Sequence, residues 1–275
     1  MSALDAAFAR ARGEDRALVV GYLPAGFPSL DGCVEAFETL AAAGVEVFEV
    51  GLPYSDPLMD GPVIQAAVQQ SLDAGTGTSA VLETVRRVVA ATGVPTVVMT
   101  YWNPVERYGA ARFAADLAAA GGAGVITPDL IPEEATEWLA AAAERSLDPV
   151  FLVAPSSTDS RLALIARTNR GFVYAASTMG VTGARAAVSS DAATLVRRVR
   201  AVTDLPVAVG LGVSAGPQAA EVARYADGVI VGSALVRTLL APEVADGADP
   251  LTALHRLAAE LVEGARAARP EEGRP

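Results

Sequence analysis

Short apolar runs alternate with alanine-rich amphipathic stretches along almost the whole chain. The apolar runs show no strict in-and-out alternation, which is typical of parallel strands that are covered on both faces. Strands are predicted at Ala17–Leu23, Val45–Val50, Thr96–Thr100, Gly124–Ile126, Pro149–Val153, Gly171–Tyr174, Val207–Val209 and Gly228–Val231. Helices are predicted near residues 30–43, 62–73, 78–92, 110–120, 132–145, 159–168, 191–202, 215–224, 233–240 and 251–268.

This alternation predicts an α/β fold in which strand–helix units close into a (β/α)8 (TIM) barrel, with a short extra helix at the N-terminus. The length of 275 residues fits, because such barrels typically need about 250 residues. We expect residues 1–268 to form a single domain and residues 269–275 to be a disordered tail. No apolar run reaches the roughly 18 residues of a membrane span, and the N-terminus does not resemble a signal peptide.

The charged residues exclude several classes of function. The net charge of −11 argues against nucleic acid or an anionic membrane as a partner. The chain contains no lysine, so it cannot supply a Schiff-base amine of that kind. Its single histidine, His255, is expected on the surface of the last helix, which excludes a histidine-rich zinc site. The lone Cys33 excludes an internal disulfide, is expected to be a small core residue, and favours a cytoplasmic location.

Two carboxylates lie where a barrel places its catalytic groups. Glu49 lies at the end of the second predicted strand, and Asp60 lies in the Gly/Pro-rich loop after it. Tyr174 is predicted to end the sixth strand at the same rim, and paired acids near such a rim can donate and accept protons. Each residue also has a structural alternative. Glu49 could be an interior acid paired with an arginine, Asp60 could cap the helix that begins near Pro62, and Tyr174 could be a core residue. Asp56, in the same loop, is expected to be exposed.

Glycine-rich turns follow three consecutive predicted strands. They are Gly180-Val-Thr-Gly183, Gly210-Leu-Gly212-Val-Ser214 and Gly232-Ser233. Backbone N–H groups in such turns, together with the start of a helix after the eighth strand, can hold a phosphate without any lysine. Any one of these glycines could be only a turn residue, but three clusters in succession favour a phosphate site.

These motifs resemble those of the tryptophan synthase α chains. The segment from Glu49 to Pro62 resembles that family's highly specific signature. Other motifs follow in the family's order: Tyr101-Trp-Asn-Pro104, Asp129-Leu-Ile-Pro-Glu-Glu134, Gly180–Gly183, Gly210–Gly212 and Gly232-Ser233. The resemblance covers nearly the whole chain. It implies a lyase that cleaves indole-3-glycerol phosphate into indole and D-glyceraldehyde 3-phosphate by retro-aldol chemistry with carboxylate acid/base catalysis. It also implies an αββα heterotetramer in which indole passes to the β chain for L-tryptophan synthesis, with pyridoxal phosphate bound by the β chain and no cofactor in this one.

The resemblance also implies a role for each matching residue. Glu49 and Asp60 would be the catalytic acids, with Tyr174 as their helper. The substrate phosphate would be bound by Gly183, Gly210, Gly212, Gly232 and Ser233. The indole pocket and the mobile loop would contain Tyr22, Met99, Tyr101, Thr182 and Leu211, with Thr182 bridging to Asp60. Asp56 and Asn103 would contact the β chain.

The chain departs from the family pattern without losing a catalytic group. Ser177-Thr178-Met179 stands where many members carry Ser-Arg and a small residue, Tyr54 replaces a common Phe, and Met59 replaces a smaller residue. Three alternatives remain open at this point. The chain could act mainly as an activator of the β chain with weak activity alone, it could be a free-standing lyase that releases indole, or it could be another phosphate-binding barrel enzyme such as a sugar-phosphate isomerase.

Overall fold

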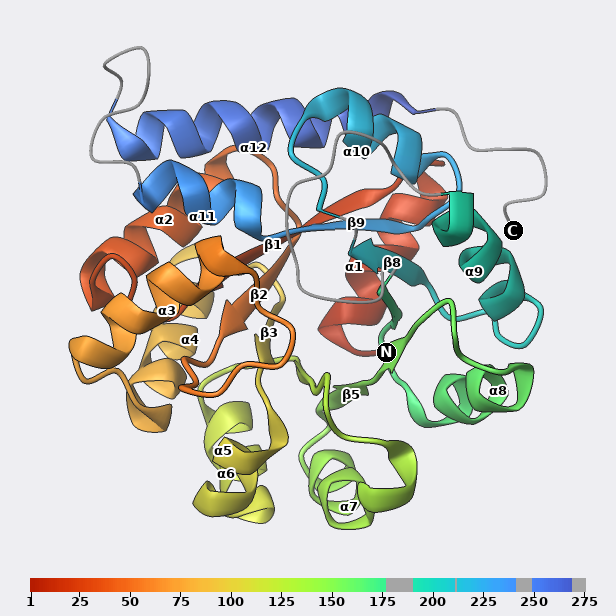
Figure 1. Cartoon of the computed structure of the whole chain (residues 1–275), viewed down its shortest axis with the longest axis horizontal. Coiled ribbons are helices and arrows are strands. Elements are labelled where there is room, and N and C mark those ends of the chain that lie inside the picture. Colours follow the sequence, from red (N-terminus) through yellow and green to blue (C-terminus); the bar gives the residue numbers. More distant parts are fainter. Residues whose placement is uncertain (177–189, 211, 241–248, 269–275) are drawn as a thin grey trace.

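The computed structural model describes residues 1–176, 190–210, 212–240 and 249–268 (Figure 1). All neighbouring strands of this part of the chain are parallel. They are β1 (Leu18–Pro24), β2 (Val47–Gly51), β3 (Thr96–Met99), β4 (Gly124–Ile126), β5 (Asp148–Val150), β6 (Leu152–Val153), β7 (Val173–Ala176), β8 (Val207–Gly210) and β9 (Gly228–Val231). Their order is β5-β4-β3-β2-β1-β9-β8-β7-β6. Because only Phe151 separates β5 from β6, the two edges of the sheet belong to one interrupted strand, and the predicted (β/α)8 barrel is confirmed.

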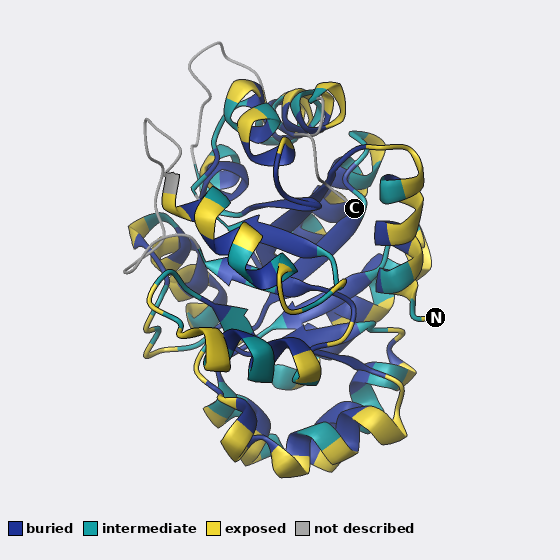
Figure 2. Cartoon of the chain, turned by 90° about the vertical axis from the view of Figure 1, so that its right-hand side faces the viewer, coloured by how far each residue is buried: buried dark blue, intermediate teal, exposed yellow. Residues whose placement is uncertain are grey.

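Helices surround this sheet, with the buried strands at the centre of the molecule and exposed side chains on the outer helix faces (Figures 1 and 2). They are α1 (Ala3–Gly13), α2 (Leu30–Ala42), α3 (Pro62–Asp73), α4 (Thr78–Thr92), α5 (Trp102–Tyr108), α6 (Ala110–Ala119), the 3-10 turn η1 (Pro132–Glu134), α7 (Thr136–Glu144), α8 (Asp159–Thr168), α9 (Ser190–Arg200), α10 (Gly216–Ala223), α11 (Ser233–Leu240) and α12 (Pro250–Ala267). None of these described helices combines the length and the hydropathy that a bilayer-crossing segment needs.

Helix α5 is the main element that the sequence pattern did not predict. It has only seven residues, and Pro104 is its third. Proline is compatible with a first helical turn, where its missing N–H has no intrahelical partner to lose, but Asn-Pro in a sequence also suggests a turn. The helix predicted over residues 132–145 is divided into η1 and α7, because Ala135 between them adopts φ −92° and ψ 12°.

The barrel interior is a separate apolar core from the one between strands and helices. Its members on the strands are Leu18, Val20, Val47, Val97, Ile126, Val150, Ala208 and Ile230, and Phe172 joins them from the position just before β7. Helix α1 adds Leu4, Ala7, Phe8 and Ala11, and the Phe8 ring lies 5.4 Å from that of Phe172. Ser2 and Asp5 form a reciprocal capping box at the start of α1. Within the described part of the chain the helix therefore closes one end of the barrel and leaves the opposite end for a ligand.

The single cysteine and the single histidine have the environments that the sequence predicts. Cys33 is fully buried in α2, where burial raises the pKa of its thiol to about 12. Such a thiol stays protonated and unreactive at neutral pH. His255 is exposed on α12. Neither residue contributes to a catalytic centre in this structure.

A buried carboxylate, Asp227, fastens α1 and α9 to the barrel. It accepts hydrogen bonds from Arg12 Nε at 3.0 Å, Arg200 at 3.2 Å and the Val207 N–H at 2.9 Å. Burial by itself would raise the pKa of Asp227, but the bonds from Arg12 and Val207 and the charge of Arg200 hold it below its usual value. The carboxylate is therefore ionised and fully partnered in the folded chain.

Replacing Asp227 by Asn should destabilise the fold by roughly 3 kcal/mol or more, because two arginines lose their buried counter-charge. Urea unfolding measures the change. The matched control is Asp159→Asn on α8, whose carboxylate pairs with Arg198 at 2.7 Å but is 84% exposed. That control should cost less than about 1 kcal/mol. Equal losses in the two variants would show that the Asp227 cluster does not fasten the helices.

Candidate active site

The last inward-facing residues of the strands line the open end of the barrel. Side chains on a strand alternate between its two faces, so residues two positions beyond an interior residue also face the interior. Val47, Val97 and Phe172 belong to the interior core, which turns Glu49, Met99 and Tyr174 toward the same space. Met99 and Tyr174 do pack against that core. Tyr22 follows Val20 in the same way, and its Cα is paired with that of Glu49.

Glu49 lies in this space as a carboxyl group with an unused acceptor. It is 2% exposed, and its Oε2 atom has no hydrogen-bond partner among the described residues. Burial raises its pKa to about 8, and the nearby charge of Asp60 adds to the rise. No arginine in the described part of the chain forms an ion pair with it. The alternative of an interior acid held by an arginine therefore does not apply there.

Asp60 reaches the same space from the loop between β2 and α3. It is 7% exposed, and Tyr101 donates its hydroxyl to Oδ1 at 3.4 Å. Burial raises the pKa of Asp60, and the Tyr101 hydrogen bond opposes that rise. The N-cap of α3 is Gly61, with no side-chain capping bond. The interpretation of Asp60 as a helix cap is therefore wrong, and its carboxylate is not used to cap α3.

Two tyrosines complete the acidic pocket. Burial raises the pKa of Tyr22 and of Tyr174 well above 10, and the charges of Glu49 and Asp60 raise both further. Both hydroxyls therefore remain protonated and can donate hydrogen bonds. Tyr174 is the second residue of β7 (Val173–Ala176), so the prediction that it ends the strand is wrong. The strand continues to Ala176, which pairs with Gly210 of β8.

Two glycines make room for these tyrosines. A Cβ atom at Gly51 would overlap the Tyr22 hydroxyl, and one at Gly210 would lie 2.6 Å from the Tyr174 hydroxyl. Gly210 was predicted only as part of a phosphate turn, so the structure adds a packing reason for it. Any larger residue at either position would move a tyrosine out of the pocket.

The other predicted phosphate residues lie at neighbouring strand ends. Gly210 pairs with Ile230, so the turn after β8 adjoins the one after β9. Gly212 has φ +69°, and Gly232 directly precedes α11, whose first residue is the buried Ser233. This places a helix start beside two glycine-rich turns, as an anion site requires. Gly183, Thr182 and Leu211 lie outside the described residues, as does the Ser177–Met179 departure.

The predicted partner residues lie on the surface beside the mouth. Asp56 is exposed and accepts a hydrogen bond from Ser55 Oγ at 2.6 Å. Asn103 is exposed on α5 and donates from Nδ2 to the Tyr54 hydroxyl at 3.2 Å. Tyr101, predicted for the indole pocket, is buried and its ring lies 5.3 Å from that of Tyr54.

Sequence reasoning gave no role to two residues of this region, although Asp129 belongs to one of the matching motifs. Leu152 is paired with Tyr174 and packs against the interior core, so it also lines the mouth. Its position two residues after Val150 could have shown this. Asp129 accepts the Trp102 N–H and thereby holds the start of α5, at 2.9 Å from Oδ1 and 3.1 Å from Oδ2. No sequence signal relates Asp129 to a helix that begins 27 residues earlier.

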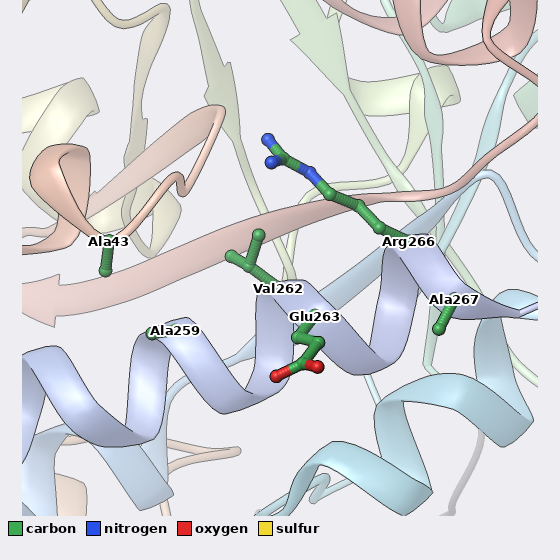
Figure 3. A pocket seen from close by; sticks show the side chains of 6 residues that line it. All are labelled: Ala43, Ala259, Val262, Glu263, Arg266 and Ala267. Atoms are coloured by element: carbon green, nitrogen blue, oxygen red, sulfur yellow. The ribbon is translucent and has the colours of Figure 1, made fainter.

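One surface hollow away from the mouth lacks comparable chemistry. Figure 3 shows that Ala43, Ala259, Val262, Glu263, Arg266 and Ala267 line it. Glu263 and Arg266 point to opposite sides in that view, and Arg266 instead lies 3.9 Å from Glu46. Among the described residues there is also no cluster of His, Cys, Asp and Glu that could hold a metal ion. The acid pair with its tyrosines is therefore the site to which the comparisons below relate.

Comparisons with known proteins agree over almost the whole chain. The family model for "Tryptophan synthase alpha chain" matches residues 8–265. A tryptophan synthase alpha chain of Salinispora tropica is 58% identical, covering 98% of this chain and 100% of its own length. That of Acidothermus cellulolyticus is 56% identical over 97% of this chain and 98% of its own. A chain in the Mycobacterium tuberculosis tryptophan synthase structure superposes with a TM-score of 0.90 at 53% identity, covering 97% of this chain and 99% of that one. The barrel described here belongs to the tryptophan synthase alpha chain family, whose members act in tryptophan synthesis.

Proposed function

We propose that this chain cleaves indole-3-glycerol phosphate to indole and D-glyceraldehyde 3-phosphate by carboxylate acid/base catalysis. The observation that carries the proposal is the pair of buried acids, Glu49 and Asp60, with no ion-pair partner among the described residues. The family role in tryptophan synthesis sets aside the sugar-phosphate isomerase alternative. The chemistry also suits a chain that has no lysine for a Schiff base.

The substrate would enter through the mouth opposite α1. Its phosphate would be held by backbone N–H groups of Gly183, Gly210, Gly212 and Gly232, with Ser233 at the start of α11. The indole ring would lie on the apolar surface that Met99 and Leu152 provide, beside Tyr22 and Tyr101. Thr182 and Leu211 belong to the same proposed pocket and mobile loop.

Each carboxyl group would have a different starting charge. Glu49, with a pKa of about 8, is mostly protonated at neutral pH and can donate its proton to C3 of the indole ring. Positive charge then develops at the ring nitrogen, and ionised Asp60 would accept the N–H hydrogen bond and stabilise it. The Glu49 carboxylate formed in this step next takes the proton of the glycerol hydroxyl adjacent to the ring.

Loss of that hydroxyl proton breaks the bond between C3 and the glycerol chain. The hydroxyl carbon becomes the aldehyde of glyceraldehyde 3-phosphate, and the bonding electrons return to the ring to give neutral indole. Glu49 recovers its proton in the same sequence, so no outside acid or base is consumed. Tyr174, protonated at all ordinary pH values, would donate a hydrogen bond to the reacting groups.

We also propose the β chain of tryptophan synthase as the partner, in an αββα heterotetramer that receives the indole. Asp56 and Asn103, both exposed beside the mouth, would contact it. Pyridoxal phosphate would belong to the β chain, and this chain would need no cofactor of its own. We place the complex in the cytoplasm. If this chain acted only as an activator, indole release would be absent in both the free and the complexed chain; a free-standing lyase would gain nothing from the β chain.

Glu49→Gln and Asp60→Asn should each lower kcat for indole release by at least about 100-fold, because each removes a positioned acid/base or charge-stabilising group. Release of indole from indole-3-glycerol phosphate is measured with and without the β chain. Glu38→Gln and Asp73→Asn change exposed acids on α2 and α3 and are the matched controls. Full activity in either active-site variant would reject the catalytic assignment.

The pH profile of kcat/KM should fall as pH rises through about 8, because Glu49 must be protonated to donate to C3. On the acid side, the midpoint at which kcat/KM increases with pH should lie above 3.8, the ordinary pKa of an aspartate. Asp60 must be ionised for the reaction, and burial raises its pKa. A profile that is flat from about pH 6 to 9 would contradict these roles.

The same ionisation should appear in stability. The pKa of Glu49 is higher in the folded chain than its ordinary 4.5, so the folded state binds this proton more tightly. The contribution of protonated Glu49 to the free energy of unfolding is fully present below about pH 4.5. It is lost as pH rises through about 8. Glu49→Gln should therefore gain stability relative to the unmodified chain between about pH 6 and 9, by an amount on the order of a few kcal/mol in urea unfolding.

Asp56→Ala should raise the concentration of β chain that gives half-maximal stimulation of indole release, since an exposed contact is removed. A titration with purified β chain measures it, and Asp159→Asn on α8 is the control. A titration curve identical to that of the unmodified chain would place the interface elsewhere.

A further inference from the structure

Two residues at the start of α5, Tyr101 and Asn103, form hydrogen bonds with the loop that carries Asp60. The Tyr101 hydroxyl accepts the Met59 N–H at 3.0 Å and donates to Asp60 Oδ1 at 3.4 Å. Two residues later, Asn103 Nδ2 donates to the Tyr54 hydroxyl at 3.2 Å. The rings of Tyr54 and Tyr101 are 5.3 Å apart. The geometry of Asp60 therefore depends on where α5 begins.

Asp129 in turn holds the beginning of α5. Tyr101 is the residue before the helix, and it makes no side-chain capping bond. Asp129, from the loop after β4, supplies that bond instead, because both of its carboxylate oxygens accept the Trp102 N–H. A short helix depends strongly on such a cap, since few intrahelical bonds remain when its first turn opens.

We propose that Asp129 is a positioning residue for Asp60, acting through the capped start of α5 and the Tyr101 hydroxyl. This inference rests on the proposed function, in which Asp60 receives the indole N–H. Asp129 itself is exposed and does not contact Asp60 in the described structure. Its effect is to fix the hydrogen-bond donor that sets the orientation of the Asp60 carboxylate.

The groups around Asp60 make its titration a direct measure of this contact. Glu49 faces it from β2, Tyr22 from β1, Tyr174 from β7 and Tyr101 from the end of β3. Of these, Tyr101 is the one whose hydrogen bond lowers the pKa of Asp60 against the effect of burial. When the Tyr101 hydroxyl is displaced, the pKa of Asp60 should rise.

The test compares Asp129→Ala, Asp129→Asn, Tyr101→Phe and the double variant Asp129→Ala/Tyr101→Phe. Asp129→Ala should lower kcat about 5-fold or more with a smaller change in KM, the effect of losing one helix cap on the catalytic geometry. Asp129→Asn should retain most of the activity, because an amide oxygen also accepts the Trp102 N–H. The double variant should be no slower than Tyr101→Phe alone, because both changes break one chain of contacts.

The matched control is Asp249→Ala. Asp249 is an exposed acid that caps α12, accepting the Leu251 and Thr252 N–H groups at 3.0 and 3.1 Å. Helix α12 lies across the molecule from α5 (Figure 1). This variant should lose stability without losing kcat. The positioning role is rejected if Asp129→Ala loses stability without losing kcat, as expected for Asp249→Ala. It is also rejected if Asp129→Ala lowers kcat by the same factor in the unmodified chain and in Tyr101→Phe.

A second readout does not require turnover. Carboxyl NMR of chain labelled with ¹³C-aspartate, with Asp60→Asn to assign the signal, follows the titration of Asp60. Its pKa should rise in Asp129→Ala and in Tyr101→Phe and stay unchanged in Asp249→Ala. If the unmodified chain released no indole even with the β chain, the proposed function would fail, and this titration would still decide the inference. An Asp60 titration unaffected by Asp129→Ala would overturn it.

Discussion

The structure depends on placing two carboxyl groups in an apolar pocket without a cation between them. An ionised carboxylate loses much of its solvation there, and two at close range also repel each other. The two carboxyl groups of the pocket respond to this constraint differently. Glu49, with an unpartnered Oε2, is the acid that gives up its charge, while Asp60 keeps a hydrogen-bond donor that favours ionisation. The tyrosines around them stay neutral for the same reason. The outcome is one acid whose pKa burial raises to about 8 and a second whose hydrogen bond from Tyr101 favours its ionised form.

Within the described residues, the barrel keeps arginine-paired acids at one end of the strands and the acids without an arginine partner, Glu49 and Asp60, at the other. At the end that α1 closes, two acids are paired with arginines: Asp227 with Arg12 and Arg200, and Glu46 with Arg16. At the open end, the described structure brings no arginine to Glu49 or Asp60. Because the strand interior between the two ends is filled by aliphatic and aromatic side chains, the arginines at one end are kept away from the acids at the other. The same sheet therefore has one end that stabilises the fold and one that is left free for chemistry.

The sequence pattern predicts the barrel well because each strand and helix is a strong local signal. The bounds of β4, β9, α3 and α8 agree with the predicted ones, and the period of two along β2 is enough to turn Glu49 inward. What it could not predict are the relations between loops. Helix α5 was missed because a seven-residue helix with an early proline has no periodic signal of its own. The structural use of Asp129 follows from the adjacency of β3 and β4 and not from any local motif. Tyr174 was placed at a strand end because the sequence does not show that β7 continues through two alanines.

The helix that the sequence pattern missed connects the surface to the pocket over three residues. Asn103 is exposed and Tyr101 is buried, and they are separated by a single residue whose N–H is held by Asp129. The backbone of both residues lies next to the N–H that Asp129 accepts, so one cap serves both. In this arrangement the exposed side of the loop after β2 and the buried Asp60 share one set of contacts with the start of α5.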